Sequence, residues 1–246
     1  MRRSDPVYVD FMASTPVDAS VIDVMAGAMR ENWGNPHSDH AHGFQASKIV
    51  DQSKEAIAAL LGAGPDEILF TSGATEANNL AVKGVMTSAA RRGNHLVVTS
   101  IEHKCVLEAA YSLSQSGVEV TEVQPDTDGL VSAEAVAQAL RPETALVSVM
   151  HANNETGVLQ PVREIAEICH QYGILFHTDA AQTVGKIDVD FDDINADLLS
   201  FSGHKFYGPK GIGGLIVSRA TPVQLVPQLD GTSPALRRAC CSDPPI

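Results

Sequence analysis

Residues 202 to 211 read Ser202-Gly-His-Lys205-Phe-Tyr-Gly208-Pro-Lys-Gly211, directly after a mostly apolar run from Ala196 to Phe201. This run is short, β-rich and followed by turn-forming residues, which is typical of a buried strand. A lysine at the end of such a strand, among small residues and glycines, is poorly explained as a solvated surface charge. We therefore predict that Lys205 is a reactive amine, a candidate for Schiff-base formation.

A second strand pattern ends in a carboxylate. The residues Gly173-Ile-Leu-Phe-His-Thr-Asp179 form another apolar run, and ligands of open α/β sheets gather at the carboxyl ends of strands. Lys205 and Asp179 are thus expected to face one crevice. A lysine that forms a Schiff base and an acid that pairs with a pyridinium nitrogen are the two groups that pyridoxal 5'-phosphate requires from a protein.

A phosphate site is predicted where a third strand pattern ends. The segment Phe70-Thr-Ser-Gly73-Ala-Thr75 places one glycine between a strand end and a sequence that opens a helix. The first N–H groups of a helix have no partner inside it and attract phosphate. Taken alone, a glycine before a helix is equally typical of an ordinary N-cap.

Composition limits the classes of partner. The chain has 246 residues, with 17 Lys and Arg against 30 Asp and Glu, and its formal net charge is -13. An acidic chain repels nucleic acid and anionic membrane surfaces, so neither is expected as a partner. No apolar run reaches transmembrane length, and the four cysteines form no spaced disulfide framework. We therefore expect a cytoplasmic, reducing compartment.

Seven short β-rich runs alternate with helical patterns along most of the chain. This alternation predicts an α/β protein with a mostly parallel sheet of about seven strands and helices on both faces. The expected strands are 67–71, 95–100, 118–123, 145–150, 174–179, 196–202 and 212–218.

Two helices are expected before the first strand. Thr15 and Pro16 read as an N-cap followed by proline at the first helical position, in a helix that runs to about Asn32. The second helix is expected from about Gly43 to a C-cap at Gly62.

Three regions are predicted along the chain. Residues 1–15 are expected to form an N-terminal arm, and residues 16–229 a single large domain. Residues 230–246 are rich in turn formers and follow neither hydrophobic period, which indicates a poorly ordered tail.

Five motifs occur in a characteristic order. They are Ser72-Gly-Ala-Thr-Glu76, His103 after a strand, His151-Ala-Asn-Asn-Glu-Thr-Gly157, His177-Thr-Asp-Ala-Ala-Gln182 and Ser202-Gly-His-Lys205. In order and spacing they resemble the cysteine desulfurases and selenocysteine lyases, in the class V branch of pyridoxal-phosphate enzymes. The resemblance runs from about Tyr8 to Leu229 and implies the large domain of a fold type I transferase.

The resemblance also implies a role for each candidate catalytic residue. Lys205 is expected to carry the cofactor. His103 is expected to stack on the cofactor ring and to handle protons, which suits an imidazole that titrates near neutrality. Asp179 is expected at the pyridinium nitrogen and Gln182 at the ring hydroxyl.

The remaining expected cofactor contacts come from the same resemblance. Asn154 is expected beside the ring and the substrate, with Asn153 as the adjacent alternative. The residues expected to hold the phosphate are Ala74, Thr75, Ser202 and His204.

The family's reaction converts L-cysteine to L-alanine and passes the sulfur on as a persulfide, for iron–sulfur cluster assembly or thiolation. The family implies a homodimer and a sulfur-acceptor or scaffold protein as partners. The sulfur-carrying cysteine and a carboxylate-binding arginine belong to a small C-terminal domain, which we expect to be missing here. Near Asp230 the chain departs from the family's Ser-Gly-Thr pattern, as after a frameshift or gene truncation.

Two other functions stay open. The first is selenocysteine lyase, whose motifs overlap with those quoted and which would take L-selenocysteine as substrate. The second is a non-catalytic remnant that at most binds pyridoxal 5'-phosphate.

Other polar residues have plainer interpretations. Cys105 lies close to the proposed site, but at the rigid start of a helix, and Cys169 fits a helix core. Cys240 and Cys241 fall in the predicted tail. No histidine or cysteine spacing indicates zinc, so no metal is expected. The histidines predicted to be buried and structural are His37, His40, His42, His95, His151, His170 and His177.

Overall fold

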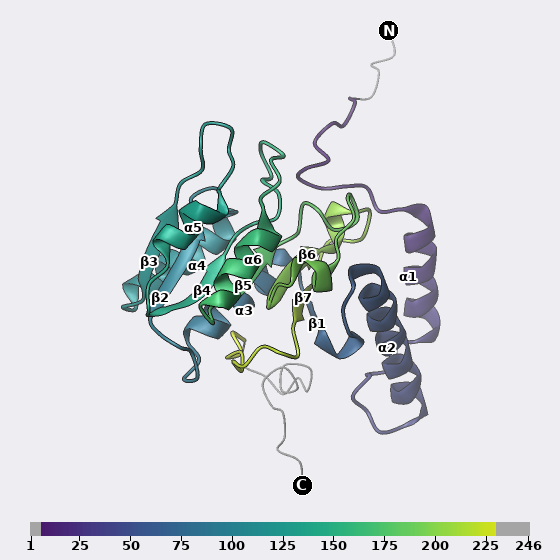
Figure 1. The fold of residues 1–246 in the computed structure, drawn as a ribbon. Coiled ribbons are helices and arrows are strands. Elements are labelled where there is room, and N and C mark those ends of the chain that lie inside the picture. Colours follow the sequence, from purple (N-terminus) through teal and green to yellow (C-terminus); the bar gives the residue numbers. More distant parts are fainter. Residues whose placement is uncertain (1–5, 230–246) are drawn as a thin grey trace.

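A seven-stranded sheet runs through the centre of the computed structural model, which describes residues 6–229 (Figure 1). The strand order is β1-β7-β6-β5-β4-β2-β3. Each predicted run is a strand, with ends within two residues of those expected. The strands are β1 (Ile68–Thr71), β2 (His95–Thr99), β3 (Glu119–Val123), β4 (Thr144–Ser148), β5 (Leu175–Asp179), β6 (Leu198–Ser202) and β7 (Gly213–Val217).

Strand direction brings the functional loops together. Within this sheet β7 pairs antiparallel with β1 and β6, whereas the other four pairings are parallel. β1 therefore points the same way as β6. The carboxyl ends of β1, β2, β4, β5 and β6 lie along one edge, where ligands of such sheets bind. The predicted mostly parallel α/β sheet is confirmed.

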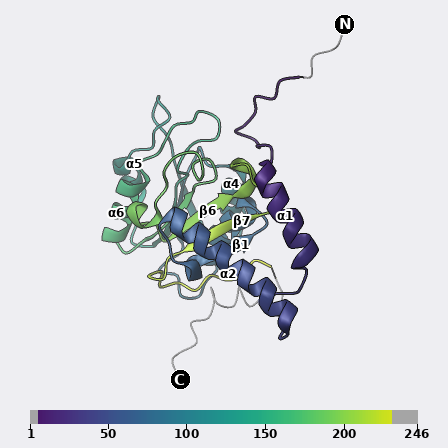
Figure 2. The ribbon, with the colours of Figure 1, turned by 90° about the vertical axis from the view of Figure 1, so that its right-hand side faces the viewer.

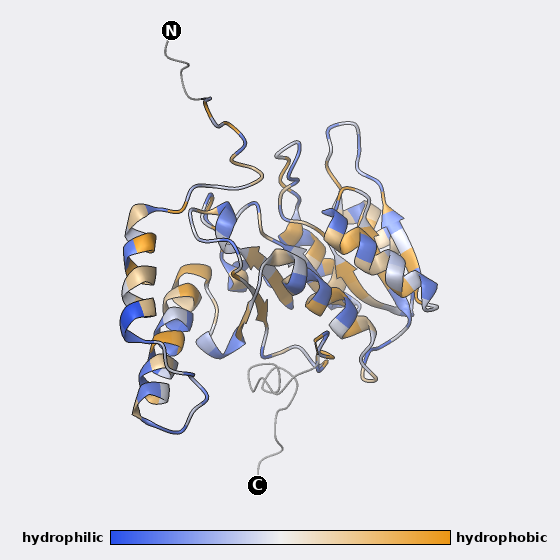
Figure 3. Ribbon diagram, turned by 180° about the vertical axis from the view of Figure 1, so that it is seen from behind, coloured by the Kyte–Doolittle hydropathy of each residue, from blue (hydrophilic) through white to orange (hydrophobic). Residues whose placement is uncertain are grey.

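Helices cover both faces of the sheet, and each face has its own apolar core. Leu80, Leu96 and Leu215 belong to the core under α3 and α4, while Ile165 and Phe176 belong to the core under α5, α6 and α7. Figure 3 shows the strands as a hydrophobic layer between these helices. The helices are α3 (Ala74–Met86), α4 (Lys104–Gln115), α5 (Ala133–Ala139), α6 (Val162–Gln171) and α7 (Phe191–Ile194).

Two N-terminal helices, α1 (Ala19–Glu31) and α2 (Ala41–Leu61), stand beside the β1 end of the sheet (Figure 2). α2 ends at Gly62, which is left-handed with φ 63°, so the predicted C-cap is confirmed. The short 3-10 turns are η1 (Pro65–Glu67) and η2 (Gly203–Lys205).

The predicted start of the first helix is wrong. The N-cap is Asp18, whose carboxylate accepts the Ser20 N–H, and α1 begins at Ala19. Thr15 has other partners: its hydroxyl donates to the His204 carbonyl (3.0 Å) and accepts the Tyr207 N–H (2.7 Å). These contacts with the loop after β6 outcompete the local capping geometry.

Residues 6–18 contain no helix or strand. They are held to the loop after β6, where the Thr15 N–H also donates to the His204 carbonyl (2.9 Å). Residues 1–5 and the predicted tail at 230–246, with Cys240 and Cys241, lie outside the described residues. Within residues 6–229, none of the helices combines the length and apolarity needed to cross a membrane.

Candidate cofactor site

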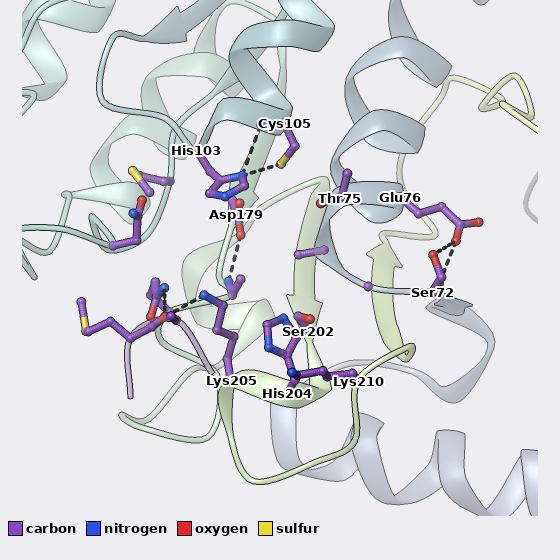
Figure 4. Close-up of a pocket in the computed structure, with 18 of the residues that line it drawn as sticks. Ser72, Thr75, Glu76, His103, Cys105, Asp179, Ser202, His204, Lys205 and Lys210 are labelled. Atoms are coloured by element: carbon purple, nitrogen blue, oxygen red, sulfur yellow. Dashed lines mark hydrogen bonds between the residues drawn. The ribbon is translucent and has the colours of Figure 1, made fainter. Parts of the chain in front are cut away.

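A cavity of about 690 Å³ opens at the carboxyl edge of the sheet (Figure 4). Its walls come from the segments that follow β1, β2, β4, β5 and β6, together with part of the N-terminal arm. The nine residues predicted for the site all line this cavity: Ala74, Thr75, His103, Asn154, Asp179, Gln182, Ser202, His204 and Lys205.

Lys205 ends the η2 turn that follows β6. Its Nζ donates to the Met12 carbonyl at 2.7 Å, which ties it to the N-terminal arm. Burial lowers the pKa of Lys205, although the charges of Asp179 and Asp10 act to raise it. A lowered pKa increases the fraction of neutral amine, which is the nucleophilic form.

Asp179 is the last residue of β5 and is 5% exposed. Its Oδ1 accepts the Ala181 N–H (2.9 Å), and its Oδ2 accepts Nδ2 of Asn78 (2.6 Å). Burial raises the pKa of Asp179, against the lowering effect of these two hydrogen bonds. Within residues 6–229 no basic side chain lies at ion-pair distance from it. A buried carboxylate in this position is suited to a cationic partner inside the cavity.

The N-terminus of α3 forms another wall. Its N-cap is Gly73, which supplies no side chain and has φ 155°, a conformation that L-residues rarely adopt. A Cβ on Gly73 would stand 3.7 Å from Oγ of Ser202, so this hydroxyl faces the helix end. The N–H groups of Ala74 and Thr75 have no acceptor inside the helix. Backbone donors, a hydroxyl and the nearby Lys210 together suit a phosphate.

His103 caps α4 and is exposed to the cavity. Its Nδ1 accepts the Cys105 N–H at 3.2 Å and lies 3.0 Å from Sγ of Cys105. Figure 4 shows its ring beside Asp179.

The two asparagines of the third motif have different surroundings. Asn153 is buried, donates to the Ile101 carbonyl (3.0 Å) and accepts from the backbone of its own turn. Asn154 instead lines the cavity. Asn154 therefore remains the candidate for contact with a ligand, and Asn153 has a structural role.

Gln182 lines the cavity with both ends of its amide engaged. Its Nε2 donates to the Met12 carbonyl (3.0 Å), and its Oε1 accepts from Nζ of Lys186 (2.9 Å). The predicted contact of Gln182 with a ring hydroxyl stays a prediction.

These residues fit pyridoxal 5'-phosphate. The cavity combines an amine of lowered pKa, a buried carboxylate without an ion-pair partner in the described part of the chain, and a helix N-terminus with free donors. Each matches one chemical feature of the cofactor: its aldehyde, its ring nitrogen and its phosphate.

Two buried polar residues beside the cavity were missed from the sequence. Asn78 is fully buried in α3 and binds Asp179. Glu102 is buried in the turn after β2, where its Oε1 accepts the Thr99 hydroxyl (2.6 Å) and the Met150 N–H (2.7 Å). Burial raises the pKa of Glu102 to about 8. Asn78 could have been found from the sequence, because it is a polar amide within the apolar stripe of a predicted helix.

The histidine predictions are partly wrong. His95, His151 and His177 are buried as expected, and His177 bridges Ser148 and Ser200 inside the sheet. The other four are exposed because they lie in the loop before α2, at its first turn, or near the end of α6: His37, His40, His42 and His170.

Comparison with known proteins identifies the family of this chain. Residues 7–245 match the family model for aminotransferase class-V. The chain is 51% identical over 227 residues to the mitochondrial cysteine desulfurase of Eremothecium gossypii, covering 92% of this chain and 46% of that protein. The chain spans about half the length of the curated relatives it matches.

Solved structures agree with the fold. SspA in complex with cysteine has a TM-score of 0.87 at 43% identity, covering 94% of this chain and 70% of that chain. A NifS-like protein has a TM-score of 0.89 at 38% identity, covering 96% of this chain and 64% of that chain. The fold and the site therefore define a class-V aminotransferase-like protein. The chain belongs to that family, as its motifs predicted, and the curated relatives cited here are named cysteine desulfurases.

Proposed function

We propose that this chain is the cofactor-binding part of a pyridoxal 5'-phosphate-dependent cysteine desulfurase, which converts L-cysteine to L-alanine and passes the sulfur on as a persulfide. The observation that carries the proposal is the convergence of Lys205, Asp179 and the α3 N-terminus on one cavity. The curated relatives named cysteine desulfurase, and a solved relative in complex with cysteine, support the same chemistry.

The residues of the cavity have different roles in this reaction. When bound, pyridoxal 5'-phosphate supplies an electron sink for the bonds at the α-carbon of an amino acid. Asp179 holds a proton on the ring nitrogen, because a buried carboxylate favours a cationic partner. Lys205 would hold the cofactor through its amine, and in its neutral form this amine would be a base close to the substrate. The α3 N-terminus and Ser202 orient the phosphate.

The two cysteines among the described residues are unsuited to accept sulfur. Burial raises the pKa of Cys105 to about 11 and that of Cys169 to about 12, and the thiolate is the nucleophilic form of cysteine. The thiol that accepts sulfur is therefore expected to come from outside the described residues, from a partner or from an added small thiol.

The test is release of sulfide and alanine from L-cysteine by the purified chain, supplied with pyridoxal 5'-phosphate and dithiothreitol. We expect equal amounts of both products, no turnover in Lys205→Ala, and retained turnover in Lys83→Ala, which alters a lysine in the last turn of α3, away from the cavity lining. Cofactor binding without sulfide release by the wild-type chain would contradict desulfurase activity and support the remnant. Turnover of L-selenocysteine alone would support a selenocysteine lyase.

The partners and the compartment are proposals that rest on the family resemblance. They are a homodimer, a sulfur-acceptor or scaffold protein in iron–sulfur cluster assembly, and the cytoplasm. Sedimentation of the purified chain tests the first, since a monomer with bound cofactor would contradict it.

A further inference from the structure

A line of hydrogen bonds connects Asp179 with His103 along the cavity wall. Nδ2 of Asn78 lies 2.6 Å from Oδ2 of Asp179 and 3.2 Å from Sγ of Cys105. The same Sγ lies 3.0 Å from Nδ1 of His103. The line therefore runs from β5 through α3 to the first turn of α4, and joins an acid and an imidazole that both face the cavity.

The Asn78 amide sets the donor and acceptor roles along this line. Its nitrogen carries two hydrogens and can only donate, so Oδ2 of Asp179 accepts from it. That nitrogen then also donates to Sγ of Cys105. The thiol hydrogen remains free to point away from Asn78, toward Nδ1 of His103.

The backbone gives the same role to His103 independently. The Cys105 N–H lies 3.2 Å from Nδ1 of His103 and can only donate. The single lone pair of Nδ1 must therefore accept from this N–H, and the thiol hydrogen can share it. A neutral imidazole with an acceptor at one nitrogen carries its proton on the other.

We propose that Cys105, oriented by Asn78, is a positioning residue that holds neutral His103 in the tautomer with its proton on Nε2. His103 then faces the cavity as a hydrogen-bond donor. The consequence for catalysis rests on the proposed function: Lys205, and not neutral His103, is the group that takes a proton from the substrate, while the Nε2–H of His103 stabilises negative charge.

The state of the thiol supports this arrangement. Burial raises the pKa of Cys105 to about 11, so at neutral pH the sulfur keeps the hydrogen that it donates. Asn78 is fully buried and has no freedom to solvate its amide elsewhere. The contacts are all made within the chain, so the tautomer is set before any ligand binds.

The test is ¹⁵N NMR of the histidine-labelled full chain without cofactor, at about pH 8, where an unperturbed imidazole is neutral. The ¹⁵N shifts of the two ring nitrogens distinguish a protonated from a bare nitrogen, and His103→Gln assigns the signal. We expect the Nε2–H tautomer in the wild type. A predominant Nδ1–H tautomer would overturn the proposal.

Three variants test the role of the thiol. Cys105→Ser retains a donor and is expected to keep the tautomer, whereas Cys105→Ala is expected to move the tautomer ratio about fivefold toward Nδ1–H, the effect of one hydrogen bond. Cys169→Ala removes another buried thiol, in α6 and not among the residues that line the cavity, and is expected to leave the His103 signal unchanged. An unchanged tautomer ratio in Cys105→Ala would overturn the role of the thiol.

The proposed function is tested separately in the same variants. Borohydride reduction of Cys105→Ala loaded with pyridoxal 5'-phosphate is expected to leave an adduct on Lys205, as in the wild type. If no variant forms an adduct, the proposed function fails, and the tautomer result stands or falls on the NMR data alone.

Discussion

The two ends of the cavity are built in different ways. At the acid end, Asp179 and Glu102 are buried, and each is bound by uncharged donors from neighbouring segments. At the basic end, Lys205 is half-buried and Lys210 is exposed, and both follow β6 on a loop. The acid end is therefore fixed by packing, whereas the basic end is more open to solvent.

Of the substitutions at the acid end of the cavity, Asp179→Asn should reduce turnover the most. The amide has the same shape but cannot hold a proton on the ring nitrogen, so we expect turnover of L-cysteine to fall by about a thousandfold. Steady-state sulfide release is the measurement. Asp197→Asn is the matched control, because Asp197 is equally buried but binds His170 and the Phe176 N–H. Equal losses in both variants would mean that the effect is structural.

Asn78→Ala should show how far the acid end depends on its buried donor. Loss of a hydrogen bond to a charged group should lower the free energy of unfolding by about 2 kcal/mol at neutral pH. The loss also raises the pKa of Asp179 further, so the difference from the wild type should shrink as pH falls and the carboxyl becomes protonated.

Urea titrations at two pH values measure this difference. Asn79→Ala is the control, because the side chain of Asn79 donates only to the Thr75 carbonyl of its own helix. A pH-independent loss in Asn78→Ala would contradict the role assigned to its amide.

Ser202→Ala tests the basic end. Ser202 faces the α3 N-terminus, so removing its hydroxyl should weaken the binding of pyridoxal 5'-phosphate about tenfold, with little change in stability. Equilibrium titration of the cofactor gives the dissociation constant. Ser200→Ala, which breaks the contact with Nε2 of His177 inside the sheet, should instead lower stability and leave the affinity unchanged. The reverse pattern would place the phosphate elsewhere.

Glu102→Gln should have the smallest effect and a distinct pH dependence. The folded pKa of Glu102 is raised to about 8 by burial, so its contribution to stability is present at low pH and is lost as pH rises through that value. The Glu102→Gln variant does not lose stability in this way. Between about pH 7 and pH 8, we expect its free energy of unfolding to rise by about 1 kcal/mol relative to that of the wild type. Chemical denaturation at the two pH values measures this change. Parallel pH curves for the two proteins would show that the carboxyl is ionised throughout.

The sheet and the cavity-lining residues Asp179 and Lys205 were predictable because both follow local rules. Apolar runs mark the strands, and Asp179 and Lys205 each stand where a run ends, so the direction of parallel strands brings them together. The buried supports were not predictable in this way. Asn78 and Glu102 acquire their roles from Asp179 and Met150, which are distant in the sequence.

The errors have a similar physical cause. Thr15 has the sequence context of an N-cap, but its hydroxyl binds the loop after β6, and Asp18 caps α1. His40 caps α2 through its Nδ1, a local role that burial statistics for histidine do not reveal. A tertiary partner therefore overrides local propensity at Thr15, whereas a local helix cap explains the exposure of His40.

The most direct test of the account is borohydride reduction of the purified chain with pyridoxal 5'-phosphate, followed by peptide mapping of the reduced adduct. The account predicts one adduct, on Lys205, where burial lowers the pKa of the amine, and none in Lys205→Ala. An adduct on Lys210 or Lys186, or no adduct in a folded chain, would contradict the assignment of this cavity as the cofactor site.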